Sequence, residues 1–251
     1  MLPAALSATF LPIGLLAASP FIGSFLGTII QRLPEGRNWT TARSCCEHCK
    51  TTLGSRDLVP VVSFVVQRGR CRYCHSEIDP FHLAVEITAA LVALAAWLVH
   101  GDDPPTMALD CLLGWWLLAL GWIDLRTMRL PDALTLPLIG AGILHGGLNG
   151  HALAAIIGAS VTWATIELIR VAFLKFRNRA ALGGGDVKLL AAIGAWNAPD
   201  MIGRIVLLAC VGGFLCYGVM VLRGKTGALW SRAIPFGPFL AAAFFLCWLI
   251  S

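Results

Sequence analysis

The sequence has little charge: only 13% of its 251 residues are Asp, Glu, Lys or Arg, about half the share of an ordinary soluble domain. Its hydrophobic share of 57% is more than a single soluble core uses, which excludes a water-soluble enzyme. Nine Trp and twelve Phe exclude a disordered chain. Most of the nine Cys lie in two close pairs or inside apolar runs, which argues against a secreted domain built on disulfides.

Long apolar runs are what the sequence does have, and a membrane-spanning helix needs about 20 such residues. The eight candidate runs are 4–30, 82–99, 106–123, 133–149, 152–173, 187–197, 201–221 and 234–250. The first run lacks the basic start and the small-residue cleavage site of a signal peptide, so we interpret it as a retained helix. The sequence therefore predicts an all-α polytopic membrane protein with about eight transmembrane helices.

The net charge of +5 is concentrated in alternate loops between these runs. Seventeen of the 19 basic residues lie at 31–80, 124–132, 174–188 and 222–233. The positive-inside rule then predicts that both termini are periplasmic and that loop 31–80 is cytoplasmic. This topology requires the short run 187–197 to count as a span, because without it loop 222–233 would lie on the wrong side.

Loop 31–80 contains two Cys-x-x-Cys pairs, Cys46 with Cys49 and Cys71 with Cys74. Each pair can turn two thiolates toward one point, and two such turns close a tetrahedral zinc site. Cytoplasmic thiols stay reduced, which favours a metal over disulfides. We therefore predict a small domain with a structural Zn²⁺ on these four cysteines and a short β-hairpin at 59–69.

Other ligand sets are open for this loop. Cys45 allows a different register of the first pair, and His48 or His75 can replace a thiolate. Two redox pairs without metal are a further alternative. The loop has eight basic and five acidic residues, a balance that argues against a nucleic-acid-binding zinc ribbon.

Six acidic residues fall inside or at the ends of the apolar runs, where a charge is costly and is a functional candidate. They are Glu86, Asp110, Asp124, Asp132, Glu167 and Asp186. Glu167 can simply pair with Arg170, three residues later. Asp132 follows a proline where a helix N-cap belongs, and Asp110 can be an interfacial residue. Glu86 can pack against a polar neighbour.

Asp124 and Asp186 differ from the other four because the expected topology places both at the cytoplasmic boundary. Asp186 follows glycines 183–185, which allow an extended peptide to approach closely. If the two carboxyl groups meet, they share one proton, since adjacent anions in a poorly hydrated site repel each other. The ionised group can then activate a water while the protonated group donates to a substrate carbonyl. A helix N-cap is the alternative role for Asp186.

Five segments in order resemble the motifs of the bacterial type IV prepilin peptidases, membrane aspartic proteases of the G-x-G-D class. They are GSFLGTIIQRLP at 23–34, the Cys-x-x-Cys pairs with FHLAVE at 81–86, DLRTMRLPD at 124–132, GGGDVK at 183–188 and IPFGPFLA at 234–241. One departure is Gly27, where the family usually has Asn. The resemblance covers nearly the whole chain.

This resemblance implies an activity and a division of the chain. Such enzymes cleave the basic leader of type IV prepilins and type II secretion pseudopilins after a Gly, and many then methylate the new N-terminus with S-adenosyl-L-methionine. Carried over by motif, the catalytic pair is Asp124 and Asp186, and Asp132 is not catalytic. The implied domains are a first transmembrane helix at 1–30, a cytoplasmic zinc domain at 31–80 and a seven-helix aspartic peptidase domain at 81–251, in the bacterial inner membrane.

Three other functions remain open at this point. The chain can be a peptidase without methyltransferase activity, because it has no G-x-G-x-x-G cofactor loop. A presenilin-like protease also uses G-x-G-D, but it expects Tyr before the first aspartate, where this chain has Ile123. A proton-coupled transporter would line a path across the bilayer with carboxylates, whereas here they gather at one face. The expected partners are prepilins and the lipid bilayer, with no nucleic acid.

Overall fold

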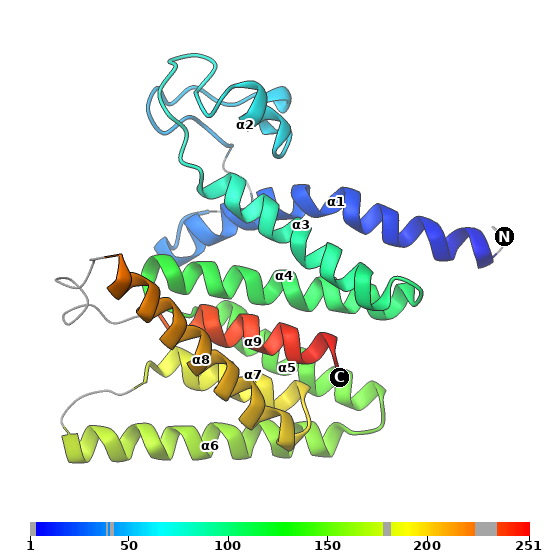
Figure 1. The fold of residues 1–251 in the computed structure, drawn as a ribbon, viewed down its shortest axis with the longest axis vertical. Coiled ribbons are helices and arrows are strands. Elements are labelled where there is room, and N and C mark those ends of the chain that lie inside the picture. The colour runs from blue at the N-terminus through cyan, green and yellow to red at the C-terminus, as the bar shows by residue number, and fades with distance from the viewer. Residues whose placement is uncertain (1–3, 39, 41–42, 178–181, 224–234) are drawn as a thin grey trace. The chain divides into compact units, whose positions relative to one another are not determined.

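The computed structural model describes residues 4–38, 40, 43–177, 182–223 and 235–251. Their regular structure is helical (Figure 1). The chain divides inside helix α4 (Pro104–Thr127) into two compact units, Met1–Ala119 and Leu120–Ser251.

Unit 1 is built on the close packing of α1 (Ala4–Arg32) against α3 (Phe81–His100) (Figure 1). A Cβ atom on Gly23 would lie 2.7 Å from the Glu86 backbone, so glycine lets the two helices touch. A Cβ on Gly27 would lie 2.7 Å from the ring of His82, a side chain and not backbone, so the packing there can adjust.

The segment between α1 and α3 forms a small domain with little regular structure, which we call the loop domain (residues 33–80). It contains two 3₁₀ turns, η1 (Leu33–Glu35) and η2 (Ser55–Leu58), and the short helix α2 (Val62–Val66). The expected β-hairpin at 59–69 is wrong: the described part of this segment holds α2, closed by hydrogen bonds such as Val65 N–H to Val61 O (3.0 Å). Valines favour extended backbone, but an isolated two-stranded hairpin buries too little surface to be stable.

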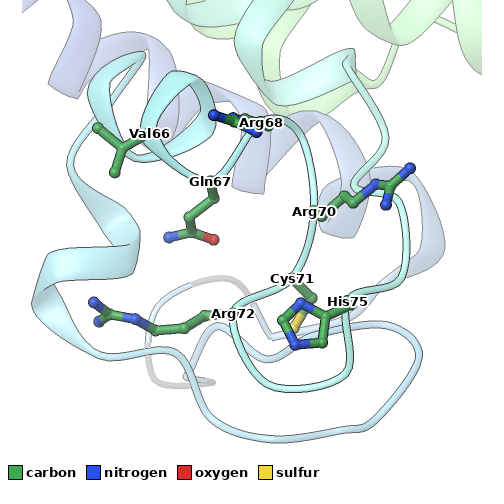
Figure 2. Close-up of a pocket in the computed structure, with 7 residues that line it drawn as sticks. All are labelled: Val66, Gln67, Arg68, Arg70, Cys71, Arg72 and His75. Atoms are coloured by element: carbon green, nitrogen blue, oxygen red, sulfur yellow. The ribbon is translucent and has the colours of Figure 1, made fainter.

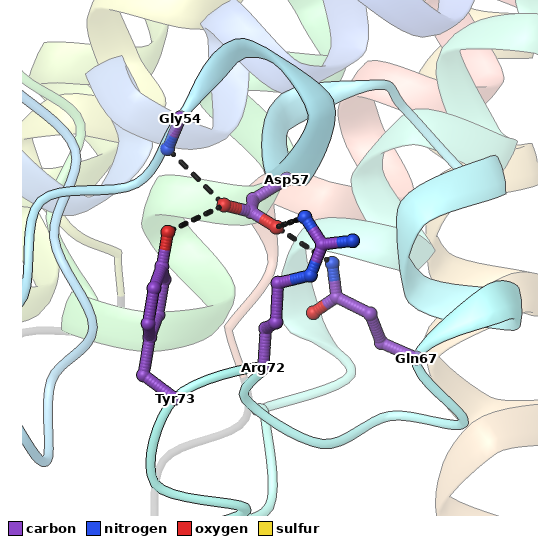
Figure 3. A network of polar contacts seen from close by, with 5 residues as sticks. All are labelled: Gly54, Asp57, Gln67, Arg72 and Tyr73. Carbon is purple, nitrogen blue, oxygen red and sulfur yellow. Dashed lines mark hydrogen bonds and ion pairs between the residues drawn. The ribbon is translucent and has the colours of Figure 1, made fainter.

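A buried carboxylate joins the two halves of the loop domain (Figure 3). The Asp57 side chain is only 4% exposed, and it accepts hydrogen bonds from the Gly54 N–H (3.2 Å) and the Gln67 amide (3.1 Å). Arg72 lies 3.6 Å away as its ion-pair partner, and the Tyr73 hydroxyl donates at 3.5 Å. Because Gln67, Arg72 and Tyr73 come from the second half, Asp57 cross-links the domain around the cysteine pairs.

Unit 2 surrounds the short helix α7 (Gly184–Trp196). It comprises the end of α4, α5 (Asp132–Leu148), α6 (Ala152–Arg177), α7, α8 (Pro199–Leu222) and α9 (Gly237–Leu249). Helix α7 is buried from Leu189 to Ala195 and packs on α5 and α6. The α6–α7 crossing is so tight that a Cβ on Gly158 would lie 2.2 Å from the carbonyl oxygen of Gly194, and such small-residue crossings are typical of membrane proteins.

Among the residues that the structure describes, five helices are long and apolar enough to cross a membrane, as a polytopic helical membrane protein requires. They are Phe10–Glu35, Phe81–His100, Pro104–Thr127, Ala152–Phe176 and Pro199–Leu222. The other three expected spans coincide with α5, α7 and α9, of 17, 13 and 13 residues. A 13-residue helix is about 20 Å long, short of a hydrocarbon core of about 30 Å, so the count of eight spans stays a prediction.

Candidate active site and metal site

The structure brings Asp124 and Asp186 into one neighbourhood of unit 2. Asp124 lies near the end of α4 and is 6% exposed, and Asp186 lies in the first turn of α7, half-buried. The two carboxyl groups are close enough for their charges to act on each other. Gly183, and not Asp186, is the N-cap residue of α7. The Asp186 carboxylate, three residues later, lies against the backbone of Gly183, so it does contribute to capping the start of the helix.

Glycine at position 185 explains how α7 comes so near the end of α4. A Cβ on Gly185 would lie 2.8 Å from the Cβ of Leu130, a buried residue just after α4. The absent side chain lets the first turn of α7 rest on the 128–131 connection. Gly184, in contrast, has nothing within 4 Å of its Cβ position.

Gly237 is a site residue that the sequence reasoning did not single out. Its backbone N–H donates to Oδ2 of Asp124 at 2.9 Å, in a buried bond across 113 residues. A Cβ on Gly237 would lie 2.7 Å from the same oxygen, so only glycine permits this approach. Gly237 lies in the segment 234–241, one of the five that carry the family resemblance, but the motif alone does not indicate that this segment contacts Asp124. Ile234 itself lies outside the described residues.

Gly237→Ala is expected to displace Asp124, because the new methyl group would overlap the carboxylate. A displacement of about 1 Å in a catalytic group can cost about 100-fold in rate, and we expect a loss of that size in prepilin cleavage. Gly203→Ala in α8 makes the matched control, since nothing lies within 4 Å of that Cβ position. Equal activity of the two variants in a peptide-cleavage assay would contradict a positioning role for Gly237.

The remaining acidic residues have partners. Glu167 accepts two bonds from Arg170, at 2.5 and 2.8 Å, as the sequence suggested. Asp110 is fully buried and lies 2.7 Å from Nδ1 of His100. These two contacts satisfy the carboxylates locally and give them structural roles.

Asp132 and Lys188 form an ion pair between the starts of α5 and α7. The N-cap interpretation of Asp132 is wrong, since Pro131 holds that position and no side-chain cap bond is present. Lys188 lies two residues after Asp186, and the contact it makes is with Asp132. Both side chains are part-exposed, so the pair contributes little to stability.

The four predicted cysteines converge in the loop domain. The Sγ atoms of Cys46, Cys49, Cys71 and Cys74 all lie within 4.8 Å of one another, and those of Cys46 and Cys74 are 3.8 Å apart. Sulfur atoms at the corners of a zinc tetrahedron are separated by roughly 3.8 Å, given a Zn–S bond of about 2.3 Å. The donor set and its spacing therefore fit a closed tetrahedral metal site.

The two cysteine pairs share one backbone geometry. In each pair the residue after the second cysteine has positive φ, 58° at Lys50 and 57° at His75, and its N–H donates to the carbonyl of the first cysteine. N–H groups of Cys49 and then His48 donate to the Cys46 thiol and lower its pKa to about 6. The thiolate is the form that binds metal.

We expect purified protein to carry about one zinc ion, sulfur-coordinated by X-ray absorption. Cys74→Ser should lose it because a serine oxygen is a poor zinc ligand. Cys45→Ser is the matched control: Cys45 is exposed, lies outside the four-sulfur cluster, and pairs by backbone with Thr52. Zinc loss in Cys45→Ser with retention in Cys46→Ser would show that the register of the first pair is wrong.

Two aspartates on different apolar helices, together with a separate four-cysteine site, are the features expected of a membrane aspartic protease. Comparison with known proteins identifies the family. A family profile described as Bacterial Peptidase A24 N-terminal domain matches residues 17–100, and one described as Type IV leader peptidase family matches residues 111–222. The chain belongs to this leader peptidase family.

Curated relatives align over most of the chain. The prepilin leader peptidase/N-methyltransferase of Aeromonas hydrophila is 36% identical over 252 residues, which cover 90% of this chain and 86% of that protein. One of the same description from Burkholderia pseudomallei (strain K96243) is 37% identical over 212 residues, covering 84% and 68%. A type 4 prepilin-like proteins leader peptide-processing enzyme of Escherichia coli O78:H11 is 33% identical, covering 88% and 87%. No solved structure is a significant match.

Proposed function

We propose that this chain is a membrane aspartic endopeptidase that removes the basic leader of type IV prepilins or type II secretion pseudopilins, cutting after a Gly. The proposal is supported by the placement of Asp124 near the end of α4 and of Asp186 in the first turn of α7, near enough for the charge of Asp124 to act on Asp186. Membership of the leader peptidase family supports the substrate class.

The proposed chemistry needs one proton on the aspartate pair. The ionised carboxylate takes a proton from a water, which attacks the scissile carbonyl, while the protonated carboxyl donates to the carbonyl oxygen. Because Gly237 holds Oδ2 of Asp124, we assign proton transfer at this residue to Oδ1.

We further propose N-methylation of the new N-terminus, as the names of the relatives indicate for those proteins. S-adenosyl-L-methionine would supply the methyl group. Zn²⁺ would be held by Cys46, Cys49, Cys71 and Cys74, and with all four positions filled by protein it would be structural.

The proposed location is the bacterial inner membrane, with both termini periplasmic and the loop domain cytoplasmic. A prepilin has a soluble basic leader followed by an apolar helix, so its scissile bond lies at the cytoplasmic boundary, the depth proposed for both aspartates. The charge pattern supports this orientation. Most of basic loop 222–233, however, lies outside the described residues.

One experiment tests both activities: purified enzyme is incubated with a prepilin, with and without S-adenosyl-L-methionine, and the product mass is read. Leader removal proceeds in detergent without an ion gradient, whereas proton-coupled transport requires a gradient across a membrane. A mass increase of one methyl group only when the donor is present supports the second activity. Cleavage without that increase would show a peptidase alone, and no cleavage of any prepilin would contradict the proposal.

A further inference from the structure

The loop domain exposes a cluster of apolar side chains that its own fold does not cover. The members lie in η2, in α2 and between them, and are 37–74% exposed: Leu58, Val59, Val62, Val65 and Val66, here called the valine patch. A one-turn helix with this many exposed valines is unfavourable in water. Transfer of the valine patch from water to an apolar environment would therefore be favourable.

A hydrogen bond fixes the valine patch at the membrane end of α3. The Val61 N–H donates to Oε2 of Glu86 at 2.7 Å, and Glu86 is buried. Glu86 lies five residues after Phe81, about 7.5 Å along a helix that is long and apolar enough to cross a membrane. The backbone that leads into α2 is therefore tied to a residue inside a candidate span.

A basic cavity adjoins the valine patch (Figure 2). It has a volume of about 600 Å³ and is lined by Val66, Gln67, Arg68, Arg70, Cys71, Arg72 and His75. Arg72 is already paired with Asp57. Arg68 and Arg70 are exposed, and neither has an ion-pair partner among the residues that the structure describes. Two unpaired guanidinium groups thus stand beside the apolar patch.

We propose that the valine patch and the basic cavity form an interfacial anchor that binds anionic phospholipids of the surrounding bilayer. The valines contact the upper acyl chains, and Arg68 and Arg70 bind the headgroup phosphate, a geometry suited to the forked guanidinium. The positive charge of Arg68 and Arg70 favours an anionic lipid over a basic prepilin leader as the ligand of the basic cavity. A basic leader would be repelled by the two arginines, whereas an anionic headgroup is attracted.

The anchor is tested by hydrogen exchange of the full-length protein in nanodiscs. With phosphatidylglycerol present, amides of residues 58–70 should exchange at least about five-fold more slowly than in pure phosphatidylcholine, the factor expected for one arginine at an anionic surface. Arg68→Gln with Arg70→Gln should abolish this difference. Arg43→Gln with Lys50→Gln removes two positive charges that flank the Cys46–Cys49 pair and do not line the basic cavity. This control variant should keep the difference in exchange between the two lipids.

Further arms separate the sources of protection. Inorganic phosphate added to phosphatidylcholine nanodiscs should not reproduce the slowing, and if it does the cavity is a free-anion site. Val65→Gln with Val66→Gln should speed exchange in both lipids while zinc content stays unchanged, which shows that the domain still folds. Exchange that is equal in both lipids, or slowed only by added prepilin, would overturn the proposal. Prepilin cleavage is measured separately, so the proposed function does not depend on this outcome.

Discussion

Replacing either Asp124 or Asp186 with Asn is expected to reduce prepilin cleavage by about 1,000-fold or more. An amide has nearly the same size as a carboxyl group, but it neither accepts a proton from water nor donates one as an acid. Each residue is needed because the ionised and protonated roles are divided between the two. The rate is measured by mass spectrometry of the released leader, and monodispersity in detergent shows that the variant is folded.

Asp132→Asn is the control for charge loss in the same region. Asp132 is exposed and pairs with part-exposed Lys188, and such surface pairs are worth about 0–1 kcal/mol. This variant should therefore keep most of its activity. A loss in Asp132→Asn equal to that of the other two would refute the assignment of the catalytic pair.

The helices of this protein were predictable because hydrophobicity is a local property of the chain. Run 82–99 appears as Phe81–His100, and run 201–221 as Pro199–Leu222. The valine-rich segment 59–69 misled the same reasoning, since its β-branched residues favour strands in isolation. The structure holds this segment partly through a hydrogen bond from Val61 to Glu86, 25 residues away, which no local pattern contains.

The sites show the same division between local pattern and tertiary contact. Two Cys-x-x-Cys pairs in one loop favour a shared metal over two redox pairs, and the four sulfurs do converge. Cys45 lies outside this four-sulfur cluster, and its backbone pairs with Thr52 across the turn. Gly237 has no side chain, so nothing in the sequence marks it as a site residue. Its hydrogen bond to Asp124 is known only from the packing of α9 against the end of α4.

Cys71→Ser with Cys74→Ser should leave measurable prepilin cleavage but reduce N-methylation by about 100-fold or more. Structural zinc supplies much of the folding free energy of a small domain, so the loop domain should lose its order without the metal. A methyl-transfer site that depends on this domain would lose its geometry, and misplaced groups cost rates of that size. The aspartates lie instead in unit 2, whose helices are held by their own packing.

The converse variant completes this separation of the two activities. Asp186→Asn should still methylate a synthetic peptide that begins with the mature Phe, because peptide hydrolysis is not part of that step. Product masses distinguish the outcomes: cleaved but unmethylated pilin from the zinc-free variant supports independent activities. If that variant is inserted and monodisperse yet leaves all prepilin uncleaved, the loop domain is part of the peptidase itself. The bond between Val61 and Glu86 would then be the first contact to test, because it joins the loop domain to the helices.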